Sequence, residues 1–506
     1  MIEVKITKMY RNVSKLFLSL ICACVLSVPA MAQQCTPFFE IIVTLKPPEF
    51  GFPSVWDTAY KRDYDKSNIE LDTVLYLEEG TALVVGRQRD KVSGKTIRIV
   101  FAELNRRGRE LREVFYKPEY EEVPVKMIRD GEGYLVVSDF ELRDYEVDLS
   151  DPHAPRKRIK LSWFDKDLKR LKEQVVKHDE YDYSAYGVVR SLEQGGFMLL
   201  AQAVSRKDKT DNHSVLIEYS KDGSELWKRS YRVGIPNKIR SVKVVDDRSY
   251  IAVGQILTDD DIHSGWAMKL DKNGAILWQR TYRRGLSSEL SDVIIKHPLD
   301  RSDTASQPNF IFSGKSIPVD GGGDAAWLMK VDTLGQPLWQ RYFRLDDYSL
   351  SAKWLMNYED GRVNMLVNAV KRQGDVGYNH IRMLSLSPRG VLLGDESYIE
   401  GGGVVATDFI EGPKMERIVT AVIDYSSAGY REGEEPIRIV GLQSKEEKKQ
   451  DPEAFLEFSG GFSDVSEEED AKAEEERLHH SKIEKGWVLV APALDAYTDP
   501  CQKRYQ

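Results

Sequence analysis

A thirteen-residue phrase occurs three times in this chain. It reads YSKDGSELWKRSY at Tyr219–Tyr231, LDKNGAILWQRTY at Leu270–Tyr282 and VDTLGQPLWQRYF at Val331–Phe343. Each copy joins an apolar strand to a Gly turn, then places Trp four residues after the Gly and an aromatic residue four positions later. Successive copies of this Gly are 51 and 61 residues apart. Self-similarity at such a period indicates a propeller or a solenoid, in which repeated units bury a continuous core against one another.

The phrase is the second half of a longer unit. Within Ser241–Leu257, two runs of alternating apolar residues flank an Asp-Asp-Arg turn, as half-buried strands require. A unit therefore contains strand A, a tight turn, strand B, a longer loop, strand C, a Gly turn and strand D. The second unit departs most, with Leu168 in the place of the Gly and Lys172 in the place of the Trp. Six units follow along the chain: Leu71–Tyr116, Val123–Val176, Tyr186–Tyr231, Ser241–Tyr282, Val293–Phe343 and Trp354–Tyr398.

A seventh unit begins at Val404–Ile410 and Arg417–Ile423 and is then interrupted. Its C strand is predicted to resume at Gly486–Val490, where a Gly-Trp pair repeats the pair that begins at Gly265. No D strand follows, and we expect Phe38–Leu45 to supply it, because a closed ring leaves no open sheet edge. The predicted fold is all-β, a seven-bladed β-propeller closed by an N-terminal strand. The count leaves six or eight blades open.

This pattern divides the chain into five segments. A signal peptide (1–32) precedes a closing strand and linker (33–68), and propeller units fill 69–425. An acidic insertion (426–485) interrupts the last unit, which ends in 486–506. The charge density of the insertion favours disorder or a short helix. A lid or docking arm over the channel mouth is the alternative.

The phrase LDxxGxxxWxxxY, preceded by an alternating hairpin, resembles the repeats of secreted bacterial β-propellers of the NHL and related groups. The resemblance covers most of Thr73–Val490 and is strongest in the third to fifth units. The phrase is also similar to the tryptophan-docking repeat of quinoprotein-like propellers, which carry one more residue between the Asp and the Gly. Such families are mostly binding or scaffolding proteins, with some enzymes among them. The resemblance therefore implies a fold and leaves the function open.

The first 32 residues have the composition of a secretory signal. Basic residues precede the apolar run Leu16–Ala30, and a small-x-small cleavage pattern ends at Ala32. Lipidation at Cys24 is a minor alternative. Cleavage removes four basic residues and one acidic residue, so the formal charge falls from −9 to −12. An acidic exported chain is a poor fit to nucleic acid or to anionic membranes, and no later segment is apolar for long enough to span a bilayer.

Two of the four cysteines, Cys35 and Cys501, remain after cleavage and lie near the two ends of the mature chain. Export brings the chain into oxidising surroundings, and the ends of a ring meet. The sequence therefore favours a Cys35–Cys501 disulfide over two free thiols.

The B–C loops are the candidate binding elements. In a propeller the B–C and D–A connections emerge on one face, and here the B–C loops are long, polar and different from one another. Acidic residues recur in them, and calcium is one interpretation, because it takes several carboxylate oxygens. No D-x-[DN]-x-[DN]-G loop is present in the sequence, which favours solvated loop charge. The candidate binding residues are Asp259, Asp260, His263, Asp320, Asp324, Asp375 and His380.

Catalytic signatures are absent from the sequence, which contains no HExxH, GxSxG or CxxC motif and no P-loop frame. His213, His263 and His380 each stand at the start of a predicted C strand. They either ring a site or are surface residues inherited from the repeat, and the second interpretation is favoured. The Trp residues of the repeated phrase are predicted to pack blade against blade rather than to stack on sugars.

These patterns predict an exported protein, in the periplasm, on the cell surface or secreted, with no cofactor. We expect it to bind or scaffold an envelope or surface protein, or a glycan, through the B–C face. The alternative is an envelope hydrolase or lyase that acts on a glycan or an ester with carboxylates at the channel mouth. Two carboxylates, or a His–carboxylate pair, converging there would favour the enzyme.

Overall fold

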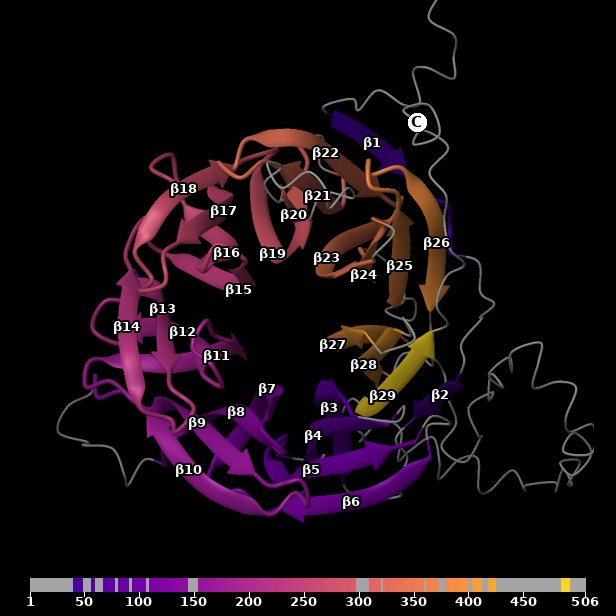
Figure 1. Cartoon of the computed structure of the whole chain (residues 1–506). Coiled ribbons are helices and arrows are strands. Elements are labelled where there is room, and N and C mark those ends of the chain that lie inside the picture. Colours follow the sequence, from indigo (N-terminus) through magenta and orange to yellow (C-terminus); the bar gives the residue numbers. More distant parts are fainter. Residues whose placement is uncertain are drawn as a thin grey trace, which may run out of the picture.

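The chain forms a ring of β-sheets around a central axis, and we call the region enclosed by the innermost strands the channel (Figure 1). The computed structural model describes residues 40–48, 56–59, 67–77, 81–90, 93–105, 109–143, 153–296, 309–319, 322–358, 361–372, 379–398, 403–411, 417–424 and 484–491. Every regular element in these ranges is a β-strand, and the strands form seven sheets. One strand of each sheet lies innermost in the ring and the others follow outwards (Figure 1). The prediction of an all-β propeller is confirmed.

Six sheets each contain four consecutive strands, hydrogen-bonded in chain order, and we number them blades 1 to 6; one of the six, blade 5, has a fifth strand as well. Blades 1 to 3 are β3 (Ser67–Tyr76), β4 (Ala82–Asp90), β5 (Thr96–Leu104) and β6 (Glu110–Tyr116); β7 (Glu121–Asp130), β8 (Gly133–Glu141), β9 (Lys157–Phe164) and β10 (Arg170–Val176); and β11 (Tyr181–Arg190), β12 (Phe197–Ser205), β13 (Asn212–Tyr219) and β14 (Glu225–Tyr231). Blades 4 to 6 are β15 (Asn237–Val245), β16 (Ser249–Leu257), β17 (His263–Leu270) and β18 (Ile276–Tyr282); β19 (Ser287–Lys296), β20 (Asn309–Ile317), β21 (Ala325–Val331) and β22 (Pro337–Arg344); and β23 (Tyr348–Asn357), β24 (Val363–Lys371), β25 (His380–Leu386) and β26 (Leu392–Tyr398).

The remaining sheet, which we call the composite sheet, joins strands from two distant parts of the chain. It contains β27 (Val404–Glu411), β28 (Arg417–Asp424), β29 (Glu484–Ala491) and β2 (Trp56–Ala59). β2 pairs antiparallel with β29. The composite sheet lies between blade 6 and blade 1 (Figure 1).

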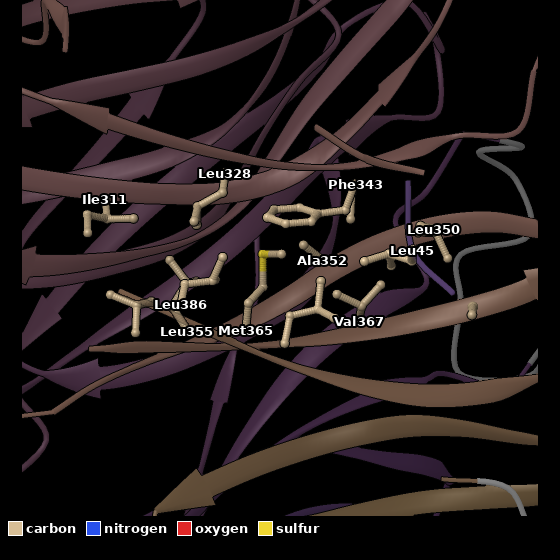
Figure 2. Packing of buried hydrophobic residues seen from close by; sticks show 14 of the residues in the cluster. Leu45, Ile311, Leu328, Phe343, Leu350, Ala352, Leu355, Met365, Val367 and Leu386 are labelled. Atoms are coloured by element: carbon tan, nitrogen blue, oxygen red, sulfur yellow. The ribbon is translucent and has the colours of Figure 1, made fainter. Parts of the chain in front are cut away.

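Neighbouring sheets are held together by buried apolar clusters, one at each junction of the described structure. At the junction of blades 5 and 6, Leu328 and Phe343 of blade 5 pack with Met365 and Val367 of blade 6 (Figure 2). Successive side chains of a strand point to opposite faces of its sheet, so each blade supplies apolar residues to both neighbours. Two of the clusters join the composite sheet to blade 6 and to blade 1, so the packing is continuous around the ring.

The prediction that Phe38–Leu45 completes the last sheet is wrong. The strand in this segment, β1 (Glu40–Thr44), pairs in parallel with β22 and is the fifth, outermost strand of blade 5 (Figure 1). The N–H of Leu45 donates to the carbonyl of Arg344 at 2.7 Å, and the Leu45 side chain is buried between blades 5 and 6 (Figure 2). A short strand of alternating apolar residues fits any open outer edge, so its pattern does not select one edge over another.

The repeated phrase fastens each blade to the next. Gly274 and Gly335 adopt φ of 75°, which favours glycine. A Cβ at Gly274 would lie 2.6 Å from the ring of Trp227 in the preceding blade, and one at Gly335 would lie 2.9 Å from the ring of Trp278. The hydroxyl of Tyr282 donates to the carbonyl of Gly335 at 2.7 Å. The Trp therefore packs against the Gly turn of the next blade, and the final aromatic residue contacts the same turn. This confirms that these Trp residues pack blade against blade.

All seven innermost strands have a β-bulge at the same place. The residue before each bulge packs between sheets, as buried Ile239 and Leu290 do. The bulged residue and the residue two positions before it lie on the other side of the strand from this packed residue. The bulged residues are all half-buried, which fits side chains at the wall of the channel: Asp72, Val125, Tyr186, Arg240, Ser291, Lys353 and Thr407.

Candidate functional site on the loop face and in the channel

The B–C loops and D–A connections meet at one end of the ring, which we call the loop face. In blade 4 the N–H of Leu257 donates to the carbonyl of Pro236 at 3.0 Å, and at blade 5 the N–H of Leu286 donates to Ile317 at 2.8 Å. Each bond joins the end of a B strand to the connection that enters the same blade. Several predicted features lie outside the described residues: Asp320, Asp375, Cys35, Cys501, the signal peptide and positions 426–483 of the insertion.

Asp260 braces the B–C loop of blade 4. Its carboxylate accepts a hydrogen bond from Thr258 Oγ1 at 2.5 Å and forms an ion pair with Arg283 of the following D–A connection. The Thr258 hydrogen bond and the Arg283 contacts hold the pKa of Asp260 below its usual value. Asp259 is exposed in the same turn, and half-buried His263 begins β17. The acidic loop residue is thus engaged by its own loop and by the connection that leads to blade 5.

A related network occupies the same place in blade 3. Asp211 accepts hydrogen bonds from Tyr181 Oη at 2.6 Å and from Arg232 at 3.0 Å, and lies 2.9 Å from Nδ1 of His213. Burial opposes ionisation of Asp211, but these three partners outweigh it and lower the pKa of the carboxyl. Burial also opposes ionisation of His213, and it therefore lowers the pKa of this imidazole. The His213 side chain is only 2% exposed. The imidazole of this His–carboxylate pair is buried, and the pair ties the loop to the blade.

Two further candidates, Asp324 and His380, belong to blades 5 and 6. Asp324 lies 3.4 Å from Lys315 Nζ, and its carbonyl accepts the N–H of Leu350 at 2.8 Å. His380 is fully buried and packs edge-on against Tyr348, with the ring centroids 4.9 Å apart. The described candidates therefore lie on three successive blades, 4, 5 and 6. Within the ranges that the structure describes, no group of three or more His, Cys, Asp or Glu is placed to hold a metal ion.

The channel wall carries acidic residues on blade 1, and these are matched by arginines. Glu70 and Asp72 lie on the same side of β3, and Arg87 contacts both, at 2.6 Å and 2.9 Å. Arg89 adds a second contact to Glu70 at 2.5 Å. Burial raises the pKa of Asp72 to about 6, against the attraction of Arg87. Two carboxylates do come together here, but one guanidinium group occupies both.

The opposite part of the wall, on blades 4 to 6, is basic. Arg240 lies over the ring of Tyr186, 5.2 Å from its centroid, and approaches Glu289 no closer than 3.8 Å. Lys315 is the cross-strand neighbour of Glu289. Lys353 has no ion pair within 4 Å among the described residues, and burial lowers its pKa although Glu289 attracts its charge. Sequence reasoning missed this group, because only the bulge register brings these residues to one wall.

Apolar side chains are exposed on the loop face over the same blades. Val319 in the B–C loop of blade 5 is 74% exposed, and Leu286 in the D–A connection beside it is 57% exposed. Val233, before blade 4, and Val370, at the end of β24 in blade 6, are also exposed. We call these four residues the apolar patch. All four are aliphatic. The connection that carries Leu286 is hydrogen-bonded to the end of β20, and Val370 belongs to β24 itself.

Comparison with known proteins gives no family for this chain. No family model and no curated protein matches it. Among solved structures, a protein of unknown function from Bacteroides caccae shares 11% identity over 66% of this chain and 94% of its own, with a TM-score of 0.32. One from Dyadobacter fermentans shares 12% identity over 66% and 97%, with a TM-score of 0.41. A neuraminidase-like protein of A/little yellow-shouldered bat/Guatemala shares 8% identity over 62% and 94%, with a TM-score of 0.37.

At these scores the likenesses carry no argument about function. The resemblance to NHL-type repeats stays a prediction. The described part of the chain contains no helix that is long and apolar enough to cross a membrane.

Proposed function

We propose that this propeller is a binding module that holds a protein partner on the loop face over blades 4 to 6. The apolar patch carries the proposal, because Leu286 and Val319 expose large parts of their side chains on two connections of blade 5 that the Leu286–Ile317 backbone hydrogen bond joins. Aliphatic side chains fit the core of a protein interface. A glycan is the less favoured occupant, because the patch has no aromatic ring on which a sugar stacks.

The rim offers a second set of exposed apolar residues, which are spread over all six blades. In each of blades 1 to 6, the Leu at the second position of strand D is exposed. This Leu lies three residues after the Gly position of the turn that precedes the strand. Scattered single residues of this kind are normal on soluble proteins and need no partner. These rim leucines are Leu111, Leu171, Leu226, Leu277, Leu338 and Leu393.

The enzyme alternative has less support in the described residues. Its two best candidates are the His213–Asp211 pair and the carboxylates of Glu70 and Asp72. The imidazole of the first pair is buried, and the carboxylates of the second are held by arginine. An acid or base that is already occupied in this way has no free proton site to offer a substrate.

Two features of the whole chain belong to the same proposal. Export after cleavage at Ala32 would present the loop face to envelope or surface proteins, and the acidic charge fits a soluble exported module. The composite sheet would serve as the seventh blade, with β2 as its outer strand. The β2–β29 pairing and the apolar clusters on both sides of this sheet support that assignment.

The test compares the loop face with the rim. Leu286→Asp and Val319→Asp place a charge in the apolar patch, and Leu277→Asp is the matched control, because Leu277 is equally exposed on the rim. Each variant is used as bait for cross-linking in the envelope fraction, with the recovered proteins compared to those of the parent chain. We expect the two patch variants to lose the same partner at least about tenfold, and the rim variant to keep it. Equal recovery by all three variants would overturn the proposal.

A further inference from the structure

The channel wall of blades 4 to 6 has more positive charge than its own acidic residues match. We propose that Arg240, Ser291 and Lys353 form a site for an oxyanion group, a carboxylate or a phosphate, at the loop-face end of the channel. The three residues occupy the bulge position of three successive blades. Equivalent positions in adjacent blades face the same channel level, so their polar groups converge on one place between them.

Three buried polar atoms of this site have no hydrogen-bond partner in the described part of the protein. Among the described residues, Arg240 Nε, Ser291 Oγ and Ser351 Oγ are buried atoms without a hydrogen bond. Ser351 lies two positions before Lys353, on the same side of β23. Buried donors are almost always satisfied, so these atoms have room for a water, an ion or the acceptor atoms of a ligand. An oxyanion is an acceptor with two or three oxygens, which fits guanidinium, ammonium and hydroxyl donors.

The charge balance points the same way. Glu289 is the acidic residue nearest to Arg240, yet the two groups stay 3.8 Å apart, which is too far for a hydrogen bond. The pKa of Lys353 is lowered by burial, and the charges of Arg240 and Lys315 add to this effect. Lys238 adds a further cation, 5.4 Å from the ring of Tyr186. On blade 1, by contrast, each channel carboxylate is paired with arginine.

A ligand can reach this site from solvent. The Arg240 side chain is 29% exposed and that of Lys315 is 33% exposed. Lys315 also contacts Asp324 in the B–C loop, which places the group near the loop face. A small anion, or the charged end of a larger molecule, would be held by Arg240 and Lys353 from opposite sides of Ser291.

Calorimetric titration of the full chain at low ionic strength tests the proposal with two probes, inorganic phosphate and glucuronate. We expect saturable binding of at least one probe, and the preferred probe tells a phosphate ligand from a carboxylate ligand. Lys353→Met and Arg240→Met should each weaken that binding about tenfold or more, as the loss of a charge-assisted hydrogen bond implies. Added salt should weaken binding further.

The matched control is Lys243→Met, which removes a cation from the same strand, β15, outside the site. Lys243 is exposed and lies 3.9 Å from Asp292. The Lys243→Met variant should change the affinity for the preferred probe by less than about twofold. Ser291→Ala removes one hydroxyl donor of the site without changing its charge. This variant serves as the second test where an Arg240 variant does not fold. No saturable binding of either probe, or an equal loss in Lys243→Met, would overturn the proposal. Leu286→Asp should leave anion binding unchanged, so this test is independent of the partner proposal.

Discussion

At the residue scale, Leu168 shows how far the repeat tolerates a departure from its own rule. It occupies the Gly position of the second unit and adopts φ of 63°, the left-handed conformation that the glycines adopt elsewhere. Its carbonyl still accepts a hydrogen bond from Tyr116 Oη of the preceding blade. The side chain is fully buried between blades 1 and 2, beside Phe164. Blade 2 therefore keeps the shape of the turn and replaces the missing Trp contact with apolar packing.

We predict that Leu168→Gly destabilises the protein, although Gly suits the backbone. Relief of the left-handed strain contributes about 1–2 kcal/mol, whereas loss of a fully buried Leu side chain costs about 3–5 kcal/mol. The net loss of unfolding free energy should be about 2 kcal/mol, measured by urea denaturation. Gly274→Ala is the converse control and should also destabilise, because its Cβ would clash with Trp227 at 2.6 Å. A Leu168→Gly variant as stable as the parent would show that packing at this turn contributes little.

At the scale of strands and loops, one position of the B strand joins blade 6 to the composite sheet and blade 2 to blade 3. In blade 6, Asn368 accepts the N–H of Ala406 at 3.0 Å and donates to its carbonyl at 3.3 Å. In blade 2 the same position is Asp139, whose carboxylate accepts the N–H of Ala185 at 2.6 Å. Burial raises the pKa of Asp139 to about 7, against that hydrogen bond and the charge of Lys157.

This raised pKa predicts the pH dependence of the junction. An unfolded Asp ionises near pH 4, at about 3.9, whereas folded Asp139 keeps its proton up to about pH 7. Stability is therefore full at low pH, falls as the pH rises between these two values, and is level above them. Asp139→Asn copies blade 6, so it should flatten this fall and stabilise the protein at pH 8 by about 1–2 kcal/mol, after a discount for partial exposure. The reciprocal variant, Asn368→Asp, should create a similar fall, and identical pH profiles for parent and Asp139→Asn would contradict the assignment.

The same elements show what the sequence predicts and where it stops. The hairpins and Gly turns of the six units are local patterns, so their strands are where the alternation of apolar residues places them, as in Ser241–Leu257. The local sequence of β1 does not determine which open sheet edge it joins, because that edge is distant in sequence. In the structure β1 pairs with β22 at the outer edge of blade 5. The acidic loop residues were recognised, but their arginine partners, such as Arg283 for Asp260, lie in another connection. The basic channel wall depends on bulges, which change the face of every following side chain and leave no mark in the sequence.

At the scale of the whole molecule, the ring depends on the junction where the last sheet meets the first blade. Asp408 of β27 accepts hydrogen bonds from Thr73 Oγ1 at 2.7 Å and from the N–H of Val74 at 3.0 Å, both in blade 1. Its carboxylate also contacts Lys126 of blade 2 at 2.6 Å. One buried side chain thus joins three sheets. Asp292 has the equivalent place in blade 5, where it bonds Ser241 of blade 4 and the N–H of Leu355 in blade 6.

Because Asp408 and Asp292 have equivalent places in two sheets, replacing each of them tests how the ring closes. Asp408→Ala leaves the Lys126 charge and the Val74 N–H without their acceptor, so it should cost about 3–5 kcal/mol of unfolding free energy. Asp292→Ala should cost less, because its partners are mainly neutral donors. The location of the effect separates the two variants more sharply than its size. The chain is continuous between blades 4 and 6, whereas blade 1 and β27 are more than three hundred residues apart in sequence. Loss of Asp408 should therefore raise amide hydrogen exchange in β3 and β27 before global unfolding, and loss of Asp292 should not. Uniform exchange across all sheets in the Asp408→Ala protein would mean that the apolar clusters alone close the ring.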